Sequence, residues 1–214
     1  MINLIIGAPR SGTTFLWTLL ENNEDVVPLT LDTFNIKGKP KKYTTSESGA
    51  FYRKQYSIVD KFIINNKSKI LIEKTPLNTL VYNEIPKKYI KNTILLYRNP
   101  VDIIASMFLS DTPLVFKKYD LNQSINETKL YYRKMQEIKN KANVIVKYED
   151  LVKDIKNLKP VLDLLDIKNY NFEFEEKISI ARRKNKKTLT DNQFEYTKSR
   201  VKDEIKIWKN LWLI

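Results

Sequence analysis

The stretch that decides the fold reads Ile2-Asn3-Leu4-Ile5-Ile6, then Gly7-Ala8-Pro9-Arg10-Ser11-Gly12-Thr13-Thr14, then Phe15-Leu16-Trp17-Thr18-Leu19-Leu20. A short apolar run that stops at a glycine-flanked turn and resumes as a second apolar run predicts a buried strand, a tight loop and a helix. The first N–H groups of a helix have no intrahelical partner and lie at the positive end of the helix dipole, so they bind anions. We therefore expect the loop at residues 7–14 to bind a phosphate or a similar anion.

This loop has the spacing of a P-loop but differs from the triphosphate-binding version at one position. A Walker A loop carries a lysine that reaches the β- and γ-phosphates, followed by a Ser or Thr on Mg²⁺. Here Thr13 stands in the place of the lysine, and the cation of the loop is Arg10. That difference favours a ligand with a short anionic bridge at the loop over an extended triphosphate with its metal ion. A glycine turn that only reverses the chain is the alternative that the motif alone leaves open.

The composition indicates one globular, basic protein. The chain has 214 residues, of which 42% are hydrophobic and 29% charged, and this is enough apolar material for a sizeable core. We expect a single domain over residues 1–214, with its core at 1–170 and a helical, basic segment at 171–214. The net charge of +13 favours anionic partners, although lysines spread over the whole surface would give the same excess.

Two residue types are missing, and their absence excludes several chemistries. The sequence contains no cysteine and no histidine, which excludes disulfides, thiolate nucleophiles, Ser-His triads and ordinary zinc catalysis. We expect no metal site. General acid–base catalysis would have to use a carboxylate, a lysine or a tyrosine. Met1 leads directly into the first strand, and no apolar run approaches the ~20 residues that span a bilayer. We therefore expect a cytoplasmic protein.

Apolar runs alternate with helical patterns along the chain. We expect strands at residues 2–6, 25–29, 69–73, 93–97 and 143–148, and helices at 15–22, 47–66, 103–109, 122–141, 158–165 and 201–212. Such alternation predicts an α/β fold, a P-loop three-layer sandwich with a central parallel sheet flanked by helices. Residues 30–48 form a lysine-rich loop in this prediction, and residues 182–187 form a second basic run.

Ligands of an open parallel sheet bind beyond the carboxyl ends of its strands. The predicted ends carry residues 7–14, Glu73 with Lys74, Arg98, and Lys147-Tyr148-Glu149. A carboxylate beside a lysine in such a crevice is a candidate base for an acceptor hydroxyl or amine, which makes Glu73 our candidate; a structural ion pair is the alternative. Arg98, together with Ser106 on the following helix, is suited to hold a second phosphate.

Four segments, taken in order, resemble the sulfotransferases that use 3′-phosphoadenosine 5′-phosphosulfate (PAPS). They are Gly7-Ala8-Pro9-Arg10-Ser11-Gly12-Thr13-Thr14-Phe15-Leu16, Glu73-Lys74-Thr75-Pro76, Tyr97-Arg98-Asn99-Pro100-Val101-Asp102 with Ser106, and Val146-Lys147-Tyr148-Glu149-Asp150-Leu151. Each motif is short and unspecific by itself. The ordered set is specific, and it spans residues 3–151, about two-thirds of the chain.

The resemblance implies a role for each matched residue. Arg10, Ser11, Gly12, Thr13, Thr14 and Phe15 would bind the 5′-phosphosulfate, with Arg10 in place of the lysine of many members. Arg98 and Ser106 would bind the 3′-phosphate, and Lys74 would lie near the transferred sulfonate. Glu73 would correspond to the glutamate proposed as catalytic base in the heparan-type branch, whereas the branch acting on small phenols and steroids uses a histidine.

The match is incomplete at the C-terminus. The glycine-bearing loop that covers the nucleotide in the small-molecule branch has no clear counterpart in this sequence. Arg182 and Arg183 of the second basic run are our candidates to replace it.

The resemblance implies sulfonate transfer from PAPS to a hydroxyl or amine of a glycan, peptide or small molecule, with PAP as product and no metal. The basic surface tilts the expected acceptor toward an acidic one. A P-loop kinase of small molecules is an alternative, disfavoured by the missing Walker lysine and by the lack of an obvious metal-binding Asp at a strand end. A non-enzymatic nucleic-acid-binding protein is a third, and it leaves the ordered strand-end motifs unexplained.

Overall fold

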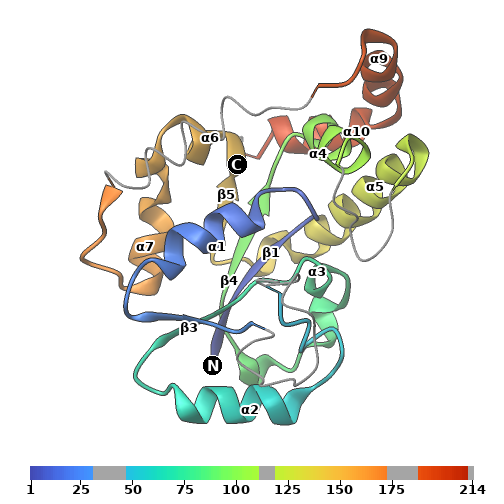
Figure 1. Cartoon of the computed structure of the whole chain (residues 1–214). Helices are drawn as coiled ribbons and strands as arrows, with labels where there is room; N and C mark the ends of the chain where they lie inside the picture. Colours follow the sequence, from blue (N-terminus) through green and yellow to red (C-terminus); the bar gives the residue numbers. More distant parts are fainter. Residues whose placement is uncertain (31–46, 111–118, 173–187, 212–214) are drawn as a thin grey trace.

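The computed structural model describes residues 1–30, 47–110, 119–172 and 188–211 (Figure 1). These ranges contain a five-stranded sheet in the order β2-β3-β1-β4-β5, in which all neighbouring strands are parallel. The strands are β1 (Ile2–Gly7), β2 (Val26–Pro28), β3 (Ile70–Glu73), β4 (Ile90–Tyr97) and β5 (Val144–Lys147). The predicted α/β fold class is therefore confirmed, and β1 lies at the centre of the sheet.

Helices pack on both faces of this sheet. The helices of the described ranges are α1 (Thr13–Glu21), α2 (Tyr56–Asn65), α3 (Asn78–Val81), α4 (Pro100–Phe108), α5 (Leu121–Ile138), α6 (Tyr148–Lys153), α7 (Lys159–Leu165), α9 (Asp191–Arg200) and α10 (Lys202–Lys209). Of these, α9 packs on α4 and α10. None of the helices in the described ranges is both long enough and apolar enough to cross a membrane.

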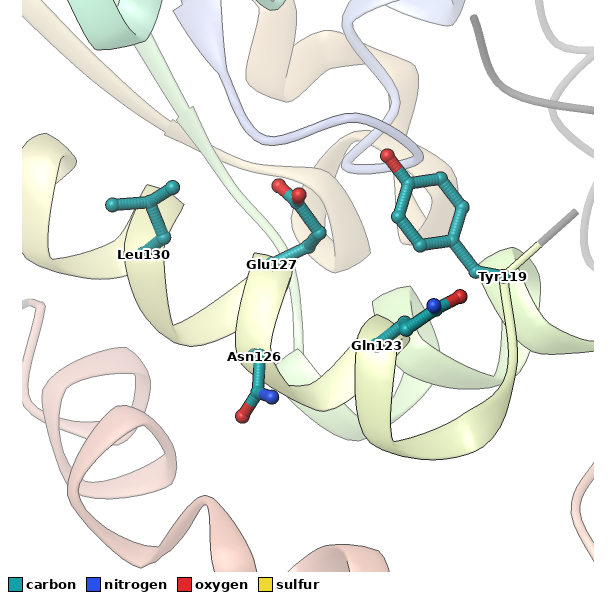
Figure 2. A pocket seen from close by; sticks show the side chains of 5 residues that line it. All are labelled: Tyr119, Gln123, Asn126, Glu127 and Leu130. Carbon is teal, nitrogen blue, oxygen red and sulfur yellow. The ribbon is translucent and has the colours of Figure 1, made fainter. Parts of the chain in front are cut away.

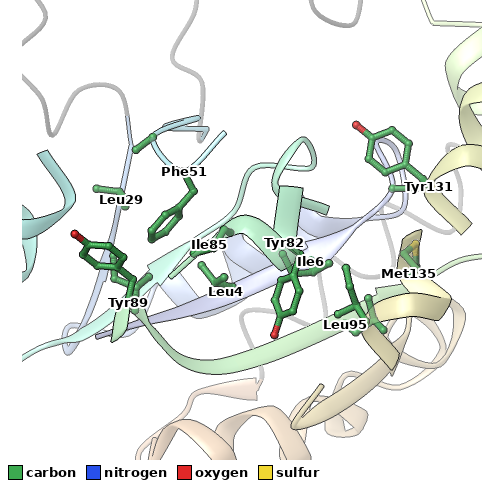
Figure 3. Packing of buried hydrophobic residues seen from close by; sticks show 14 of the residues in the cluster. Leu4, Ile6, Leu29, Phe51, Tyr82, Ile85, Tyr89, Leu95, Tyr131 and Met135 are labelled. Atoms are coloured by element: carbon green, nitrogen blue, oxygen red, sulfur yellow. The ribbon is translucent and has the colours of Figure 1, made fainter. Parts of the chain in front are cut away.

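The side chains of β1 alternate between two hydrophobic clusters because successive strand residues point to opposite faces. Leu4 and Ile6 lie in one cluster with residues of α2, α4 and α5 (Figure 3). Ile5 lies in the other cluster, with α1, α6 and α7. The strand is buried along its whole length, which explains why its sequence is apolar without alternation. The central position of β1 places the loop after it in the middle of one sheet edge.

One predicted helix boundary is wrong. The periodicity predicts a helix from residue 47, but α2 begins at Tyr56. The preceding residues turn instead: Gly49 and Lys54 have φ angles of 59° and 55°, and the backbone N–H of Gly49 donates to Thr75 Oγ1 at 3.0 Å. Phe51 is buried in the core, so its apolar character reflects packing of the turn and not a helical face. This turn covers the carboxyl end of β3.

The sequence patterns do not predict α9, because its composition is strongly polar and gives no apolar periodicity. A capping box starts it, in which the Thr190 hydroxyl accepts from the N–H of Gln193 and the Gln193 amide oxygen accepts from the N–H of Thr190. The expected closing helix is confirmed as α10 (Lys202–Lys209). Its Ile205 and Trp208 pack against the core, while Trp212 lies outside the described residues.

Candidate functional site

The loop between β1 and α1 is held in a tight conformation by two close approaches. A Cβ added to Gly7 would lie 2.8 Å from Ser11 Oγ and 2.9 Å from the Leu96 carbonyl oxygen. Gly12 has a φ of 101°, and a Cβ there would lie 2.2 Å from a ring carbon of Tyr148. Glycine is therefore required at both positions, for space at Gly7 and for both space and backbone angle at Gly12.

Arg98 reaches this loop from the end of β4. Its Nη1 donates to the carbonyl oxygen of Arg10 at 2.7 Å, and its guanidinium lies 4.5 Å from the centre of the Tyr148 ring. The Tyr132 hydroxyl of α5 donates to the backbone carbonyl of Arg98, which fixes the chain where β4 ends. The structure thus brings Arg98 to the loop, as the sequence predicts, and α4 begins directly after it.

Arg10 occupies the left-handed region with a φ of 65°, although it is not a glycine. Its Nη2 donates to Ser110 Oγ just beyond α4. Burial lowers the pKa of Arg10, Glu47 opposes that shift, and the nearby Arg98 adds to it. The two guanidiniums are therefore close enough to repel each other, and an anion between them would relieve that repulsion.

Lys74 lies at the end of β3 with its side chain fully buried. Its Nζ donates to Thr14 Oγ1 at 3.0 Å and pairs with Glu47 Oε1 at 3.0 Å. Glu47 is 39% exposed in this pair. No sequence motif marks Glu47, because it lies where the predicted loop and the predicted helix meet and contacts Lys74 only in the fold. The pair places a carboxylate and a lysine beside the start of α1.

Glu73 is completely buried, and three side chains donate to its carboxylate. Ser48 Oγ and Thr75 Oγ1 donate to Oε1 at 2.8 Å and 2.5 Å, and the Asn78 amide donates to Oε2. Burial raises the pKa of Glu73 to about 7, although the hydrogen bonds from Thr75 and Ser48 and the charge of Lys74 oppose the rise. The carboxyl group can therefore exchange a proton near neutral pH.

This raised pKa predicts how stability varies with pH. The folded state binds a proton at Glu73 more tightly than the unfolded state between pH 4.5 and about 7, so the contribution to the free energy of unfolding falls as pH rises through that window and is constant above it. Between these two pH values we expect the free energy of unfolding of the wild type to fall by roughly 3 kcal/mol relative to that of Glu73→Gln. Urea denaturation of both proteins at about pH 4.5 and about pH 8 measures the difference; an unchanged difference would contradict the raised pKa.

Glu149, at the end of β5, links the C-terminal helix to the sheet edge. Its Oε1 accepts from the backbone N–H of Asn99 at 2.7 Å, and its Oε2 accepts from Trp208 Nε1 at 3.2 Å. Lys147 Nζ lies 4.3 Å from the Trp208 ring centre. Burial is the main cause that raises the pKa of Glu149. These contacts hold α10 against the segment that carries Arg98.

Of four other predicted site residues, two lie within the described ranges and two lie outside them. The Phe15 side chain is 1% exposed and packs edge-on against Tyr148, with ring centres 5.9 Å apart. Ser106 is half-buried on α4 and makes no hydrogen bond within the described residues. Arg182 and Arg183 belong to the segment 173–187, which is not described.

A family model described as "Sulfotransferase family" matches residues 4–171. The chain belongs to the sulfotransferase family. The match includes β1 from Leu4 onward, the loop after it and the ends of β3, β4 and β5. A search of curated proteins gave no match.

Two solved structures have the fold of this sulfotransferase. One is the sulfotransferase domain from the curacin biosynthetic pathway, with a TM-score of 0.57 and 14% identity over 94% of this chain and 97% of that one. The other is mouse sulfotransferase SULT7A1 complexed with PAP, with a TM-score of 0.57 and 17% identity over 98% of this chain and 84% of that one. At such identities the likeness establishes the shared fold.

The site of this sulfotransferase suits an anionic ligand. Ser11 Oγ and Arg98 Nε are buried and have no hydrogen-bond partner among the described residues. Buried polar atoms are normally paired, so donors left over beside a helix N-terminus fit an anion that pairs with them. The loop amides, the hydroxyl and the guanidinium are together the donor set that phosphate or sulfate oxygens need.

Proposed function

We propose that this sulfotransferase uses PAPS as donor and transfers its sulfonate to a hydroxyl or amine, with PAP as the product. One observation carries the proposal: Arg98 hydrogen-bonds to the loop between β1 and α1, Lys74 hydrogen-bonds to Thr14 in the first turn of α1, and the buried carboxylate of Glu73 is next to Lys74 in the chain. Cationic and anionic groups thus meet at the carboxyl ends of β1, β3 and β4. This is the edge where ligands of parallel sheets bind.

The donor would be held at two places. Ser11, Gly12, Thr13 and Thr14 with the guanidinium of Arg10 would bind the 5′-phosphosulfate, supported by the unpaired Ser11 hydroxyl and the first turn of α1. Arg98 and Ser106 would bind the 3′-phosphate; in support, the Nε of Arg98 is buried and has no hydrogen-bond partner among the described residues. Phe15 would contribute its backbone and not its ring, because the ring is buried in the core.

PAPS supplies a sulfonate whose bond to a phosphate oxygen is broken in the reaction. A new S–O or S–N bond forms to the acceptor, the acceptor proton goes to Glu73, and negative charge passes to the phosphate oxygen of PAP. Arg10 and the loop amides would stabilise that charge, and Lys74 would steady the sulfonate oxygens. Glu73, with a pKa of about 7, is suited to accept the proton. The chain has no histidine for this step, which favours the glutamate-base branch of the family.

Titration calorimetry with the whole chain tests the donor. We expect PAP to bind in the absence of metal, because the charges that hold it belong to the protein. Binding of Mg·ATP together with no response to PAP would contradict the proposal and favour a kinase. Incubation with radiolabelled PAPS and a panel of hydroxyl- and amine-bearing acceptors then tests transfer; PAP binding with release of free sulfate alone would refute group transfer to an acceptor.

A further inference from the structure

Two consecutive residues after β5 join the C-terminal helix to the proposed donor site. The ring centre of Tyr148 lies 4.5 Å from the guanidinium of Arg98. Glu149, the next residue, accepts from the backbone N–H of Asn99 at 2.7 Å and from Trp208 Nε1 at 3.2 Å. Helix α10 is thus connected, through one carboxylate, to the corner at which β4 ends and α4 begins.

Arg98 and Glu149 carry opposite charges at this corner but form no ion pair within the described residues. They are close, because Asn99, which donates to Glu149, follows Arg98 directly in the chain. Burial raises the pKa of Glu149, and the hydrogen bonds from Asn99 and Trp208 and the charge of Arg98 oppose the rise. Opposite charges in a partly buried place attract strongly. The two hydrogen bonds of Glu149 therefore compete with an ion pair between it and Arg98.

The guanidinium of Arg98 keeps a donor for a ligand as a result. Its Nη1 donates to the carbonyl oxygen of Arg10 at 2.7 Å, whereas its Nε is buried and has no partner among the described residues. A carboxylate on that nitrogen would satisfy it, and its charge would repel a phosphate oxygen from the same place. The orientation of Glu149 thus decides whether Arg98 can bind an anion.

Helix α10 is held in place by more than its hydrogen bond to Glu149. Its Ile205 packs in an apolar cluster with Val101 and Ile104 of α4, and its Trp208 ring centre lies 4.3 Å from Lys147 Nζ. Trp208→Phe keeps an aromatic ring for both the core and the lysine, and it removes the N–H. The hydrogen bond can therefore be tested with little loss of packing.

Helix α5 supports the same corner through the backbone. Its Tyr132 hydroxyl donates to the carbonyl oxygen of Arg98. A pocket of about 220 Å³ also lies on α5, but no described residue of the proposed donor site lines it (Figure 2). Tyr132 is two and a half helical turns beyond Gln123 of that lining, and so lies on the opposite face. The α5 contact fixes the Arg98 backbone and leaves the guanidinium to be placed by Tyr148, Glu149 and the loop.

We propose that Trp208 is a positioning residue for the 3′-phosphate: its indole N–H holds Glu149 away from Arg98 and so keeps the guanidinium available for the anion. This inference rests on the proposed function, since it concerns the same phosphate site. Trp208 touches neither the nucleotide nor the acceptor and acts through Glu149. Without the indole N–H, one carboxylate oxygen of Glu149 would turn to Arg98 Nε and compete with the phosphate.

Calorimetry of the whole chain with PAP and with AMP tests this role. Trp208→Phe is expected to weaken PAP binding roughly tenfold, as one competing hydrogen bond to a charged group supplies. AMP affinity should change much less, because AMP has no 3′-phosphate. Trp17→Phe is the matched control, since Trp17 Nε1 is buried and has no partner among the described residues; it should leave both affinities unchanged.

Glu149→Gln distinguishes positioning from a purely structural contact. It removes the competing charge and keeps an oxygen for the Asn99 N–H, so it should bind PAP at least as tightly as the wild type and should restore PAP affinity when combined with Trp208→Phe. An unchanged PAP affinity in Trp208→Phe, equal losses for PAP and AMP, or a loss that Glu149→Gln does not reverse would overturn the inference.

Glu149→Gln also decides the question by itself if Trp208→Phe does not fold. Weaker PAP binding in that single variant would mean that Glu149 is only an anchor for the corner, and the inference would be wrong. In all these cases PAP binding by the wild type leaves the proposed function standing. Failure of the wild type to bind PAP would refute the proposed function itself.

Discussion

Glu73→Gln is expected to lower the turnover number for sulfonate transfer by roughly 10²–10⁴-fold, the usual contribution of a general base. Gln has the size of Glu and still accepts hydrogen bonds from Ser48 and Thr75, so PAP affinity should change little. Turnover is measured with radiolabelled PAPS, and PAP affinity by calorimetry. Unchanged turnover would exclude Glu73 from the proton transfer.

The pH profile adds a second readout. A base must be ionised to act, so the wild-type kcat/KM should rise about tenfold per pH unit below the pKa of Glu73, about 7, and level off above it. Glu73→Gln should lack this limb, because amides do not titrate. A profile that keeps the limb in the variant would show that another group titrates.

Glu47→Gln is the matched control for this experiment. Glu47 is also a carboxylate in contact with the catalytic edge, but it is partly exposed and paired with Lys74. We expect its loss to have a much smaller effect on turnover than the loss of Glu73. The opposite result would assign the proton transfer to Glu47 and give Glu73 a structural role, as the anchor of Ser48, Thr75 and Asn78.

Arg98→Ala is expected to weaken PAP binding by roughly 10- to 100-fold, because hydrogen bonds to charged groups contribute about 1.5–3 kcal/mol each. The effect should depend on the 3′-phosphate. Calorimetry with AMP, which lacks that phosphate, is therefore the decisive comparison: we expect AMP affinity to change much less than PAP affinity. Equal losses for both nucleotides would mean that Arg98 acts only through its hydrogen bond to the Arg10 carbonyl.

Arg133→Ala provides a control for the loss of positive charge. Arg133 is exposed on α5, so its removal lowers the net charge by the same amount without touching the loop. We expect it to leave the ratio of PAP to AMP affinities unchanged. A similar fall in that ratio would indicate that PAP responds to the general basic surface and not to Arg98.

Much of the fold followed from local patterns. The apolar run at residues 2–6 and the glycine turn after it predicted β1 and the helix α1, and the expected helix at 103–109 is confirmed as α4, which begins earlier because the Asn99 side chain caps it by accepting from the Val101 N–H at 3.0 Å. Both signals depend on residues next to one another in the chain, so they are readable without the fold. The predicted start of α2 was wrong because the apolar Phe51 belongs to a turn that packs against the core.

Long-range pairings were not predictable in the same way. The ion pair of Lys74 with Glu47 and the hydrogen bonds of Glu73 with Ser48 and Asn78 join residues that no motif connects.

The sequence alone determined the parallel α/β architecture, the glycine turn between the first strand and the first helix, and the residue types available for chemistry, because strand and helix periods, glycine turns and the absence of histidine are properties of the chain itself. Tertiary structure alone decided that Glu73 is fully buried with a raised pKa and that Lys74 contacts Thr14 and Glu47. Burial and the distance between charges depend on how distant segments pack, and these two quantities set the energy of a charge inside a protein.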